Sequence, residues 1–400
     1  MSGKVLKNPF GLYLHIPFCE HRCSYCHFFT TTQYKKSTLQ RYTQGLVQEI
    51  REGATFLKKQ GWFDEVDSIF FGGGTPSLLP VDSFSAIQEA LQSSFLIKQS
   101  VEVSMEANPE TISKEFCDGL KKQGFINRIS LGVQSFKPQF LKKLDRIGTQ
   151  TQIFKAIKLL HNTGFKNINL DLMFGIPKQK ISDLKQELQT IVKCHPTHVS
   201  CDNLTLPQSH VLSTYLPTDD HCAMLYQYLV NWLQERGYMQ YEISNFSKPN
   251  FECIHNLIYW SGGNYLGFGP SAASCFFDAN SHVFWRKKNT HSLSNYLSAE
   301  DHASIFDSTW TVNTPEETLT EGIFLELRKN SGIHLPTFEK KYQCRLVDRH
   351  LLDTLIKRDL LQKTKACLIL TEKGRLLADS VVLELMDVYG FDSSRSYGAH

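Results

Sequence analysis

The 400-residue sequence lacks any uncharged apolar run long enough to cross a bilayer, so we expect no integral membrane segment. Its first ten residues contain Lys4 and Lys7 but no apolar stretch followed by a cleavage site, unlike a signal peptide. Basic residues exceed acidic ones only slightly, 43 against 40, so charge gives no reason to expect a nucleic-acid partner. Internal repeats and low-complexity segments are also missing. These absences favour a soluble, cytoplasmic globular protein.

The cysteines lack the pairing typical of a disulfide framework, because their count of eleven is odd. Eight of them are scattered without metal-ligand spacing and are more typical of buried thiols in a reducing compartment. These eight are Cys117, Cys194, Cys201, Cys222, Cys253, Cys275, Cys344 and Cys367. Cys19, Cys23 and Cys26 differ, because they lie within eight residues. The sequence therefore places its candidate metal chemistry in one short segment.

Strand-like and helix-like patterns alternate through the first half of the chain. Strands are expected at Gly11–Ile16, Asp67–Phe71, Val101–Ala107, Arg128–Val133, Asn167–Met173 and His198–Thr205. Helices are expected between them at Leu39–Lys59, Phe84–Phe95, Lys114–Gln123, Gln150–Thr163 and Ser182–Cys194. This series predicts an α/β fold whose parallel sheet curls into a partial (β/α)6 barrel. In such folds the loops after the strands carry the chemistry.

The alternation weakens after Pro207. Residues 221–236 look helical, whereas 241–290 are rich in glycine, aromatics and asparagine without clear periodicity. Later patterns predict helices at Glu316–Lys329, Asp348–Arg358 and Glu372–Met386, with a hairpin of Leu361–Thr364 and Cys367–Thr371. These elements suggest a small winged-helix-like α+β module. We therefore expect three domains, comprising a barrel at 1–210, an extension at 211–313 and a C-terminal domain at 314–400.

The cysteine segment Cys19-Glu-His-Arg-Cys23-Ser-Tyr-Cys26 follows the first expected strand. Thiolates are the usual ligands of iron–sulfur clusters, and three of them leave one iron of a [4Fe–4S] cluster without a protein ligand. The alternative is a structural zinc ion with His15, His21 or His27 as its fourth ligand. Structural zinc usually draws on two separated ligand pairs, and no second pair is present. The spacing therefore favours the cluster.

Several motifs together resemble one family. They are the Tyr13-Leu-His-Ile-Pro-Phe run with its C-x3-C-x2-C, Phe71-Gly-Gly-Gly-Thr-Pro-Ser77, Glu106-Ala-Asn-Pro109, Gly132-Val-Gln-Ser-Phe136, Asp171-Leu-Met-Phe-Gly-Ile-Pro177, His255-Asn-Leu-Ile-Tyr-Trp260 and Tyr265-Leu-Gly-Phe-Gly-Pro-Ser-Ala272. Their order resembles the radical S-adenosylmethionine (SAM) superfamily, in the branch of oxygen-independent coproporphyrinogen oxidases and HemW-type heme chaperones. The resemblance spans about residues 11–330.

This resemblance implies a radical SAM barrel that binds a [4Fe–4S] cluster and SAM. In that family the methionine end of SAM occupies the open iron, and one electron breaks its sulfonium bond to give a 5′-deoxyadenosyl radical. By resemblance the SAM contacts are Tyr13, Tyr25, Gly73, Gly74, Thr75, Glu106, Gln134, Arg146 and Asp171. From the residues alone, Glu106 and Asp171 fit equally well as structural partners of Arg128 or Arg146, because a buried carboxylate needs a partner.

His255 lies in a His-Asn-x-x-Tyr-Trp segment that resembles the heme-binding segment of the HemW-type chaperones. Imidazole suits heme iron, and Tyr259 and Trp260 are suited to packing on a porphyrin face. A histidine considered alone is more often structural, and that alternative stays open.

The resemblance leaves a choice between chaperone and oxidase. Phe28 stands where the oxidases have a further cysteine, and Cys19 lies close to the N-terminus, so a chaperone that delivers heme to apo-hemoproteins is favoured. An oxidase acting on coproporphyrinogen III is the alternative, and a winged-helix regulator with a sensing cluster is the weakest hypothesis. Both family readings imply an electron donor. His27 replaces a usual aspartate, and residues 200–210 lack an expected tyrosine and glutamate.

Overall fold

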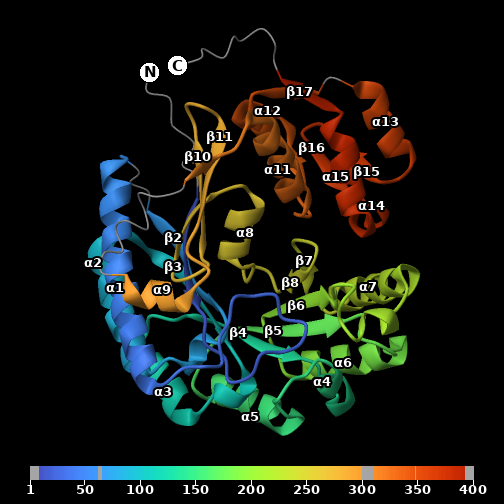
Figure 1. The fold of residues 1–400 in the computed structure, drawn as a ribbon. Helices are drawn as coiled ribbons and strands as arrows, with labels where there is room; N and C mark the ends of the chain where they lie inside the picture. The colour runs from blue at the N-terminus through green and yellow to red at the C-terminus, as the bar shows by residue number, and fades with distance from the viewer. Residues whose placement is uncertain (1–8, 62–64, 300–309, 347, 392–400) are drawn as a thin grey trace.

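The computed structural model describes residues 9–61, 65–299, 310–346 and 348–391. The outermost residues of the expected first and third domains, 1–8 and 392–400, lie outside these ranges. Within the described residues, one sheet of twelve strands runs in the order β12-β11-β10-β9-β1-β2-β3-β4-β5-β6-β8-β7. Figure 1 shows this sheet curled, with helices on its outer face.

The centre of the sheet is a series of parallel strands that follow one another along the chain. They are β1 (Phe10–Ile16), β2 (Val66–Gly73), β3 (Ile97–Ala107), β4 (Arg128–Gln134), β5 (Asn167–Phe174) and β6 (His198–Asn203). Helices α1 (Lys36–Lys59), α2 (Val81–Ser94), α3 (Lys114–Gln123), α5 (Gln150–Asn162) and α6 (Ile181–Lys193) connect them. The predicted partial (β/α)6 barrel is therefore confirmed. A short helix, α4 (Pro138–Lys143), was not predicted.

Strand alternation sorts side chains between two faces of this sheet. On β3, Val103 and Met105 are completely buried in the apolar layer beneath the helices. Their neighbours Ser104 and Glu106 face the barrel interior, where Glu106 lines a cavity. The same alternation on β4 to β6 gives the barrel a polar interior, lined by serine, asparagine, aspartate and arginine.

Residues 211–312 supply both edges of the sheet. The elements are α7 (Asp219–Gln234), β7 (Met239–Gln240), β8 (Asn245–Ser247), α8 (Ile254–Trp260), β9 (Asn264–Phe268), β10 (Ala273–Asp278), β11 (Val283–Lys288), α9 (Leu293–Ser298) and β12 (Thr311–Val312). β9 pairs parallel with β1, whereas β8 pairs antiparallel with β6. The stretch without periodicity thus contains real strands, buried on both faces.

The C-terminal module packs around an apolar core distinct from that of the barrel, to which Cys275 and Phe277 of β10 and Phe284 of β11 also contribute. It contains α11 (Pro315–Leu327), β13 (Ile333–His334), α12 (Leu335–Tyr342), β14 (Cys344–Leu346), α13 (Arg349–Lys357), β15 (Leu361–Lys363), β16 (Cys367–Leu370), α14 (Glu372–Leu376), α15 (Ala378–Met386) and β17 (Tyr389–Phe391). The β13-β16-β15 sheet packed by helices is the expected winged-helix-like α+β arrangement. The domain limits at 210 and 313 remain predictions.

One expected helix, Glu372–Met386, is wrong as a single element. The chain leaves the helical conformation at Leu377, with φ −119° and ψ 26°, between α14 and α15. Gly374 lies so close to the Leu360 carbonyl oxygen that an added Cβ would be 1.9 Å from it, which fixes α14 in place. The turn then lets α15 bury Val381, Val382 and Leu385.

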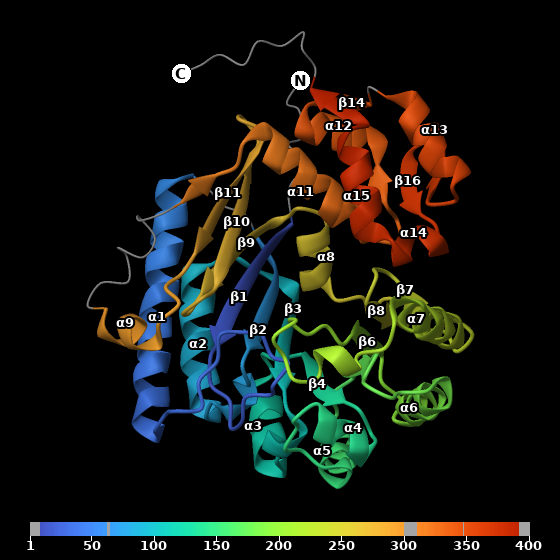
Figure 2. The ribbon, with the colours of Figure 1, turned by 45° about the vertical axis from the view of Figure 1, so that its right-hand side comes forward.

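Helix α8 closes the end of the barrel at which the strands begin. It contacts β1, β2, β9 and α11, and Figure 2 shows it between the barrel and the C-terminal module. Among the described residues, no helix has both the length and the apolar character needed to cross a membrane.

Candidate functional site

The cysteine loop follows β1 and crosses the end of the barrel at which the strands finish. Its start and finish are tied together, because the Cys19 amide donates to the Thr31 carbonyl at 3.0 Å and the Thr31 amide donates to the Pro17 carbonyl at 2.7 Å. Phe18 is completely buried beneath the loop. The Cys26 amide donates to the Cys23 carbonyl at 3.0 Å, which forms a tight turn. The loop is therefore anchored to the barrel at defined points.

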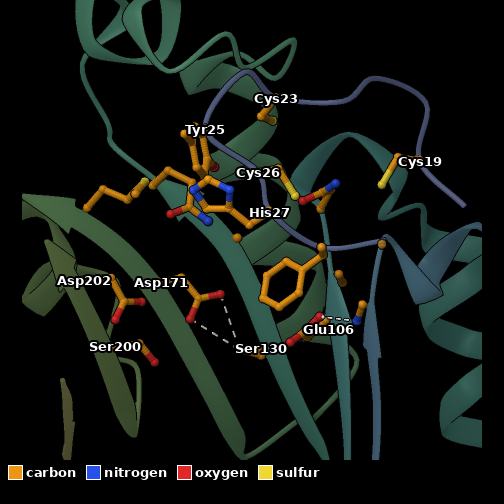
Figure 3. A pocket seen from close by; sticks show the side chains of 18 of the residues that line it. Cys19, Cys23, Tyr25, Cys26, His27, Glu106, Ser130, Asp171, Ser200 and Asp202 are labelled. Atoms are coloured by element: carbon orange, nitrogen blue, oxygen red, sulfur yellow. Dashed lines mark hydrogen bonds between the residues drawn. The ribbon is translucent and has the colours of Figure 1, made fainter. Parts of the chain in front are cut away.

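A cavity of about 490 Å³ lies under this loop. Figure 3 shows Cys19, Cys23 and Cys26 on one side of it and Glu106, Asp171 and Asp202 on the strands opposite. The expected site residues that line the cavity are Cys19, Cys23, Tyr25, Cys26, Gly73, Gly74, Glu106, Gln134, Arg146 and Asp171. The fold thus brings together residues that are up to about 150 positions apart in the sequence, at the strand ends where ligands bind in such folds.

Side-chain hydrogen-bond donors contact two of the three thiols. Thr75 donates its hydroxyl to Cys19 Sγ at 3.5 Å, and Arg146 donates to Cys23 Sγ at 3.7 Å. Arg146 is held by Asn108 Oδ1 at 2.9 Å and by the Gly132 carbonyl at 3.0 Å. Burial raises the pKa of the Cys19 thiol, and the Thr75 hydroxyl opposes this shift. Sulfur atoms facing a guanidinium and a hydroxyl are suited to carrying negative charge when they ligate metal.

The histidines considered for a zinc site are mostly engaged elsewhere. His15 is 3% exposed and its Nε2 lies 2.8 Å from the Phe29 carbonyl oxygen. His21 Nε2 lies 3.0 Å from the Asp145 carboxylate. His21 and His27 line the cavity, whereas His15 does not. In the described part of the chain, no three His, Cys, Asp or Glu side chains converge on one point as the ligands of a single ion must. Three thiols spread around a cavity fit a larger group, such as a cluster, better than one zinc ion.

The two predicted carboxylates are half-buried and have no ion-pair partner among the described residues. Glu106 accepts from the Gly73 amide at 3.0 Å, and burial together with the charge of Asp171 raises its pKa to about 7. Asp171 accepts from Asn169 at 2.6 Å, and burial together with the charge of Asp202 raises its pKa to about 6. Among the described residues, neither carboxylate forms an ion pair with Arg128 or Arg146. Acceptors held in this way suit the hydroxyl or cationic groups of a ligand.

Gly73 and Gly74 are required by close approach of the chain. Gly73 has φ 107°, and an added Cβ would lie 2.5 Å from the His15 ring. A Cβ on Gly74 would lie 2.7 Å from the Phe18 carbonyl oxygen. Gln134 also has a left-handed backbone, with φ 63°, which is uncommon for a residue other than glycine. Such conformations often accompany functional sites.

Three expected site residues do not line the cavity. Tyr13 points its hydroxyl at His15 Nδ1, 3.1 Å away. Thr75 lies behind Cys19 and accepts from Asn108 Nδ2 at 2.9 Å. His255, on α8, lies at the other end of the barrel.

The sequence reading missed several polar residues of the cavity. They are Asn108, Arg128, Ser130, Asn169, Ser200, Asp202, Asn245 and Asn256. Most of them occupy alternate positions on β4, β5 and β6, on the same face as the predicted residues. The two-residue alternation of side chains, applied to each of these strands, would have identified the residues that lie on them.

A chain of buried hydrogen bonds continues from Asp171 toward α8. Asn169, which donates to Asp171, places its Oδ1 2.6 Å from His198 Nδ1. His198 Nε2 lies 2.9 Å from the Tyr241 hydroxyl, and Asn256 of α8 donates to that hydroxyl at 3.4 Å. Burial lowers the pKa of His198 well below its ordinary value of 6.5, so its ring is neutral. The barrel interior therefore connects the cavity to α8 through neutral polar groups.

His255 is enclosed by the strands. It is 1% exposed, its Nδ1 lies 2.8 Å from Ser68 Oγ, and its Nε2 lies 2.9 Å from the Tyr259 hydroxyl. Burial lowers its pKa to about 3, and the nearby Arg128 adds to this shift. The Glu102 carboxylate accepts from the His255 amide at 3.2 Å at the first turn of α8. In this arrangement both ring nitrogens of His255 are occupied.

Comparison with known proteins supplies the family. Residues 13–191 match the Radical SAM superfamily, and residues 313–377 match the HemN C-terminal domain. The heme chaperone HemW of Bacillus subtilis is 32% identical over 384 residues, which cover 92% of this chain and 97% of that protein. HemW of Lactococcus lactis is 30% identical over 387 residues, covering 94% and 97%.

Among solved structures, coproporphyrinogen III oxidase (HemN) from Escherichia coli superposes with a TM-score of 0.76. The match covers 96% of this chain and 91% of HemN at 23% identity, which shows a shared fold. The identity to the HemW proteins over nearly their whole length is the stronger relation. The chain therefore carries a radical SAM domain and belongs to the HemW family of heme chaperones.

Proposed function

We propose that this protein is a heme chaperone that carries a [4Fe–4S] cluster and SAM, binds heme and delivers it to acceptor apo-hemoproteins. The observation that carries the proposal is the similarity to HemW proteins, which extends over 92% of this chain at 32% identity. The name of those relatives supports heme as the cargo. Eleven free thiols support a reducing, cytoplasmic location. An electron donor for the cluster is part of the proposal.

Cys19, Cys23 and Cys26 are proposed as the ligands of the cluster. When bound, a cluster with one open iron supplies an electron and a coordination site for the amino and carboxylate groups of SAM. Around it, Arg146 holds positive charge beside Cys23, and Gly73 and Gly74 let the backbone approach a ligand closely. Glu106 and Asp171 offer carboxylate oxygens from the strands opposite.

One residue of the cavity favours the chaperone over the oxidase. Phe28, which is 61% exposed and lines the cavity, stands where the oxidases resemble one another in having a cysteine. His27, which lines the same cavity, is a departure from the chaperone pattern, because it replaces a usual aspartate. An oxidative decarboxylation of coproporphyrinogen III is the alternative function.

Heme titration of anaerobically purified protein tests the proposed function directly. We expect saturable binding of one heme per chain, measured by absorption spectroscopy. We also expect transfer of that heme to an apo-hemoprotein. Under the same conditions, with SAM and a reductant, coproporphyrinogen III should remain unconverted. Formation of vinyl groups would instead assign the protein to the oxidases, and a lack of heme binding would overturn the proposal.

Asp171→Asn tests the proposed SAM site. The amide keeps the shape of the side chain but removes its charge and replaces one of its two acceptor oxygens with an NH2 donor, so we expect SAM affinity to fall about tenfold or more. Equilibrium dialysis with cluster-loaded protein measures this change. Asp183→Asn is the matched control, because Asp183 lies on α6, does not line the cavity and forms an ion pair with Lys137. Equal SAM affinity in the two variants would remove Asp171 from the site.

His255 remains the proposed heme ligand. Its Nε2 is covered by the Tyr259 hydroxyl, so ligation of iron requires Tyr259 to move first. Tyr259 thus stands between His255 and the surface of α8 that faces the C-terminal module.

A further inference from the structure

A second cavity, of about 260 Å³, lies on the outer side of α8. It is enclosed by α8, by β9 to β11 and by α11 of the C-terminal module. Its lining is Tyr259, Trp260, Gly262, Gly263, Tyr265, Cys275, Arg286, Glu321 and Leu325. None of these residues lines the cavity under the cysteine loop. This cavity is therefore separate from the one under the cysteine loop.

Aromatic rings form one wall of this second cavity. The Tyr259 and Tyr265 rings meet edge to face, 4.5 Å apart and at 72°. The Arg328 guanidinium lies 4.5 Å above the Trp260 ring, and Trp260 Nε1 is buried without a hydrogen-bond partner. Rings of this kind suit a flat aromatic ligand.

A guanidinium stands beside these rings. Arg286 donates to Tyr265 Oη at 2.9 Å and forms a two-point ion pair with Glu321, with Nε 3.1 Å from Oε2. The two side chains are 28% and 25% exposed, so solvent reaches the pair. Arginine binds carboxylates through two parallel hydrogen bonds. A ligand carboxylate can therefore take the place of Glu321 on Arg286 without leaving an unpaired charge buried.

We propose that this cavity binds the carboxylate-bearing edge of a porphyrin, with one propionate on Arg286 and the ring against Tyr259 and Trp260. The proposal rests on the proposed function, because heme is the cargo assigned there. The volume is below the roughly 300–1,000 Å³ of sites that enclose a whole small ligand, so only an edge enters. A porphyrin held by one edge stays accessible to an acceptor protein.

Tyr259 connects this site with His255. Its ring lines the second cavity, while its hydroxyl lies 2.9 Å from His255 Nε2. A porphyrin edge entering the cavity meets that tyrosine first. The propionate on Arg286 then holds the macrocycle in place, whether or not Tyr259 subsequently uncovers the imidazole.

The test changes each half of the Arg286–Glu321 pair and compares heme with heme dimethyl ester, which lacks free carboxylates. Arg286→Gln should bind heme about tenfold or more weakly, because a charged hydrogen bond is lost. Glu321→Gln should bind heme severalfold more tightly, because the internal competitor is removed. Arg286→Lys should fall between wild type and Arg286→Gln. Neither glutamine variant should change affinity for the ester.

A purely structural ion pair predicts a different pattern, since breaking it from either side should weaken heme and ester alike. Arg358→Gln and Glu384→Gln, which break a comparable pair in the C-terminal module, are the matched controls and should leave both affinities unchanged. Two results would overturn the cavity assignment alone, provided that wild type binds heme. In the first, Arg286→Gln and Glu321→Gln bind heme as tightly as wild type does. In the second, these variants lose affinity for heme and for the ester in parallel. Failure of wild type to bind heme overturns the proposed function as well.

Discussion

Replacing any one of Cys19, Cys23 and Cys26 with serine is expected to abolish stoichiometric binding of iron and sulfide. A hydroxyl is a poor substitute for the thiolates that hold iron–sulfur clusters. The structure adds that all three sulfurs face one cavity and that Arg146 and Thr75 contact two of them. Because the proposal gives the cluster three protein ligands, each loss is expected to leave too few to retain it. Iron and sulfide analysis after anaerobic reconstitution measures the effect.

Cys222→Ser is the matched control for these variants. Cys222 is a half-buried free thiol that lies outside the cysteine loop and does not line the cavity. The Cys222→Ser variant should therefore bind iron at the wild-type level. Retention of iron in the Cys23→Ser protein, or a single zinc ion in place of iron in wild type, would contradict the cluster assignment. His21→Ala and His27→Ala separate these outcomes further, because both histidines line the cavity and a zinc ion would need one of them as its fourth ligand.

The barrel was predictable because its signals are local. Alternation of Val103 and Met105 with Ser104 and Glu106 records one apolar and one polar face of β3, and the helix between each pair of strands forces parallel pairing. The antiparallel strands β10 and β11 carried no such signal. Phe276 and Phe277 are buried next to Cys275, so both faces of β10 are apolar, and on β11 the buried Phe284 is followed by Arg286 and Lys287, so neither strand shows a period of two.

The environment of His255 could not be predicted from its motif, since the residues around it come from elsewhere. Its partner Ser68 is 187 positions away on β2, and an added Cβ on Gly11 of β1 would lie 3.1 Å from its ring. Only the tertiary fold brings these groups together. The resemblance is the basis for proposing His255 as a heme ligand, whereas the structure shows that its ring nitrogens contact Ser68 and Tyr259. Arg286 and Glu321 escaped notice for the same reason, because they lie in the extension and the C-terminal module.

Glu49 is expected to be among the most important single residues for stability. This carboxylate of α1 is completely buried and accepts from the Gly269 amide at 2.7 Å, from Asn289 Nδ2 at 2.8 Å and from the Tyr296 hydroxyl at 2.7 Å. It thereby ties the first helix of the barrel to the chain beyond β9. Glu49→Ala leaves three buried donors without this acceptor, and we expect the free energy of unfolding to fall by about 3–5 kcal/mol. Gln48→Ala, on the exposed side of the same helix, should change it by less than about 0.5 kcal/mol.

The pH dependence of stability provides a second test of Glu49. Burial raises its pKa to about 7 from an ordinary value of 4.5, although its hydrogen bonds oppose the shift. Between these two values the unfolded chain binds fewer protons at this site than the folded chain, so the Glu49 contribution to stability falls as pH rises from about 4.5 to about 7. Glu49→Gln carries no titrating group, so its stability should fall less than that of wild type across this range. Urea unfolding of both proteins at pH 5 and pH 8 measures the difference, and parallel losses in the two proteins would show that Glu49 is already ionised in the folded chain at pH 5.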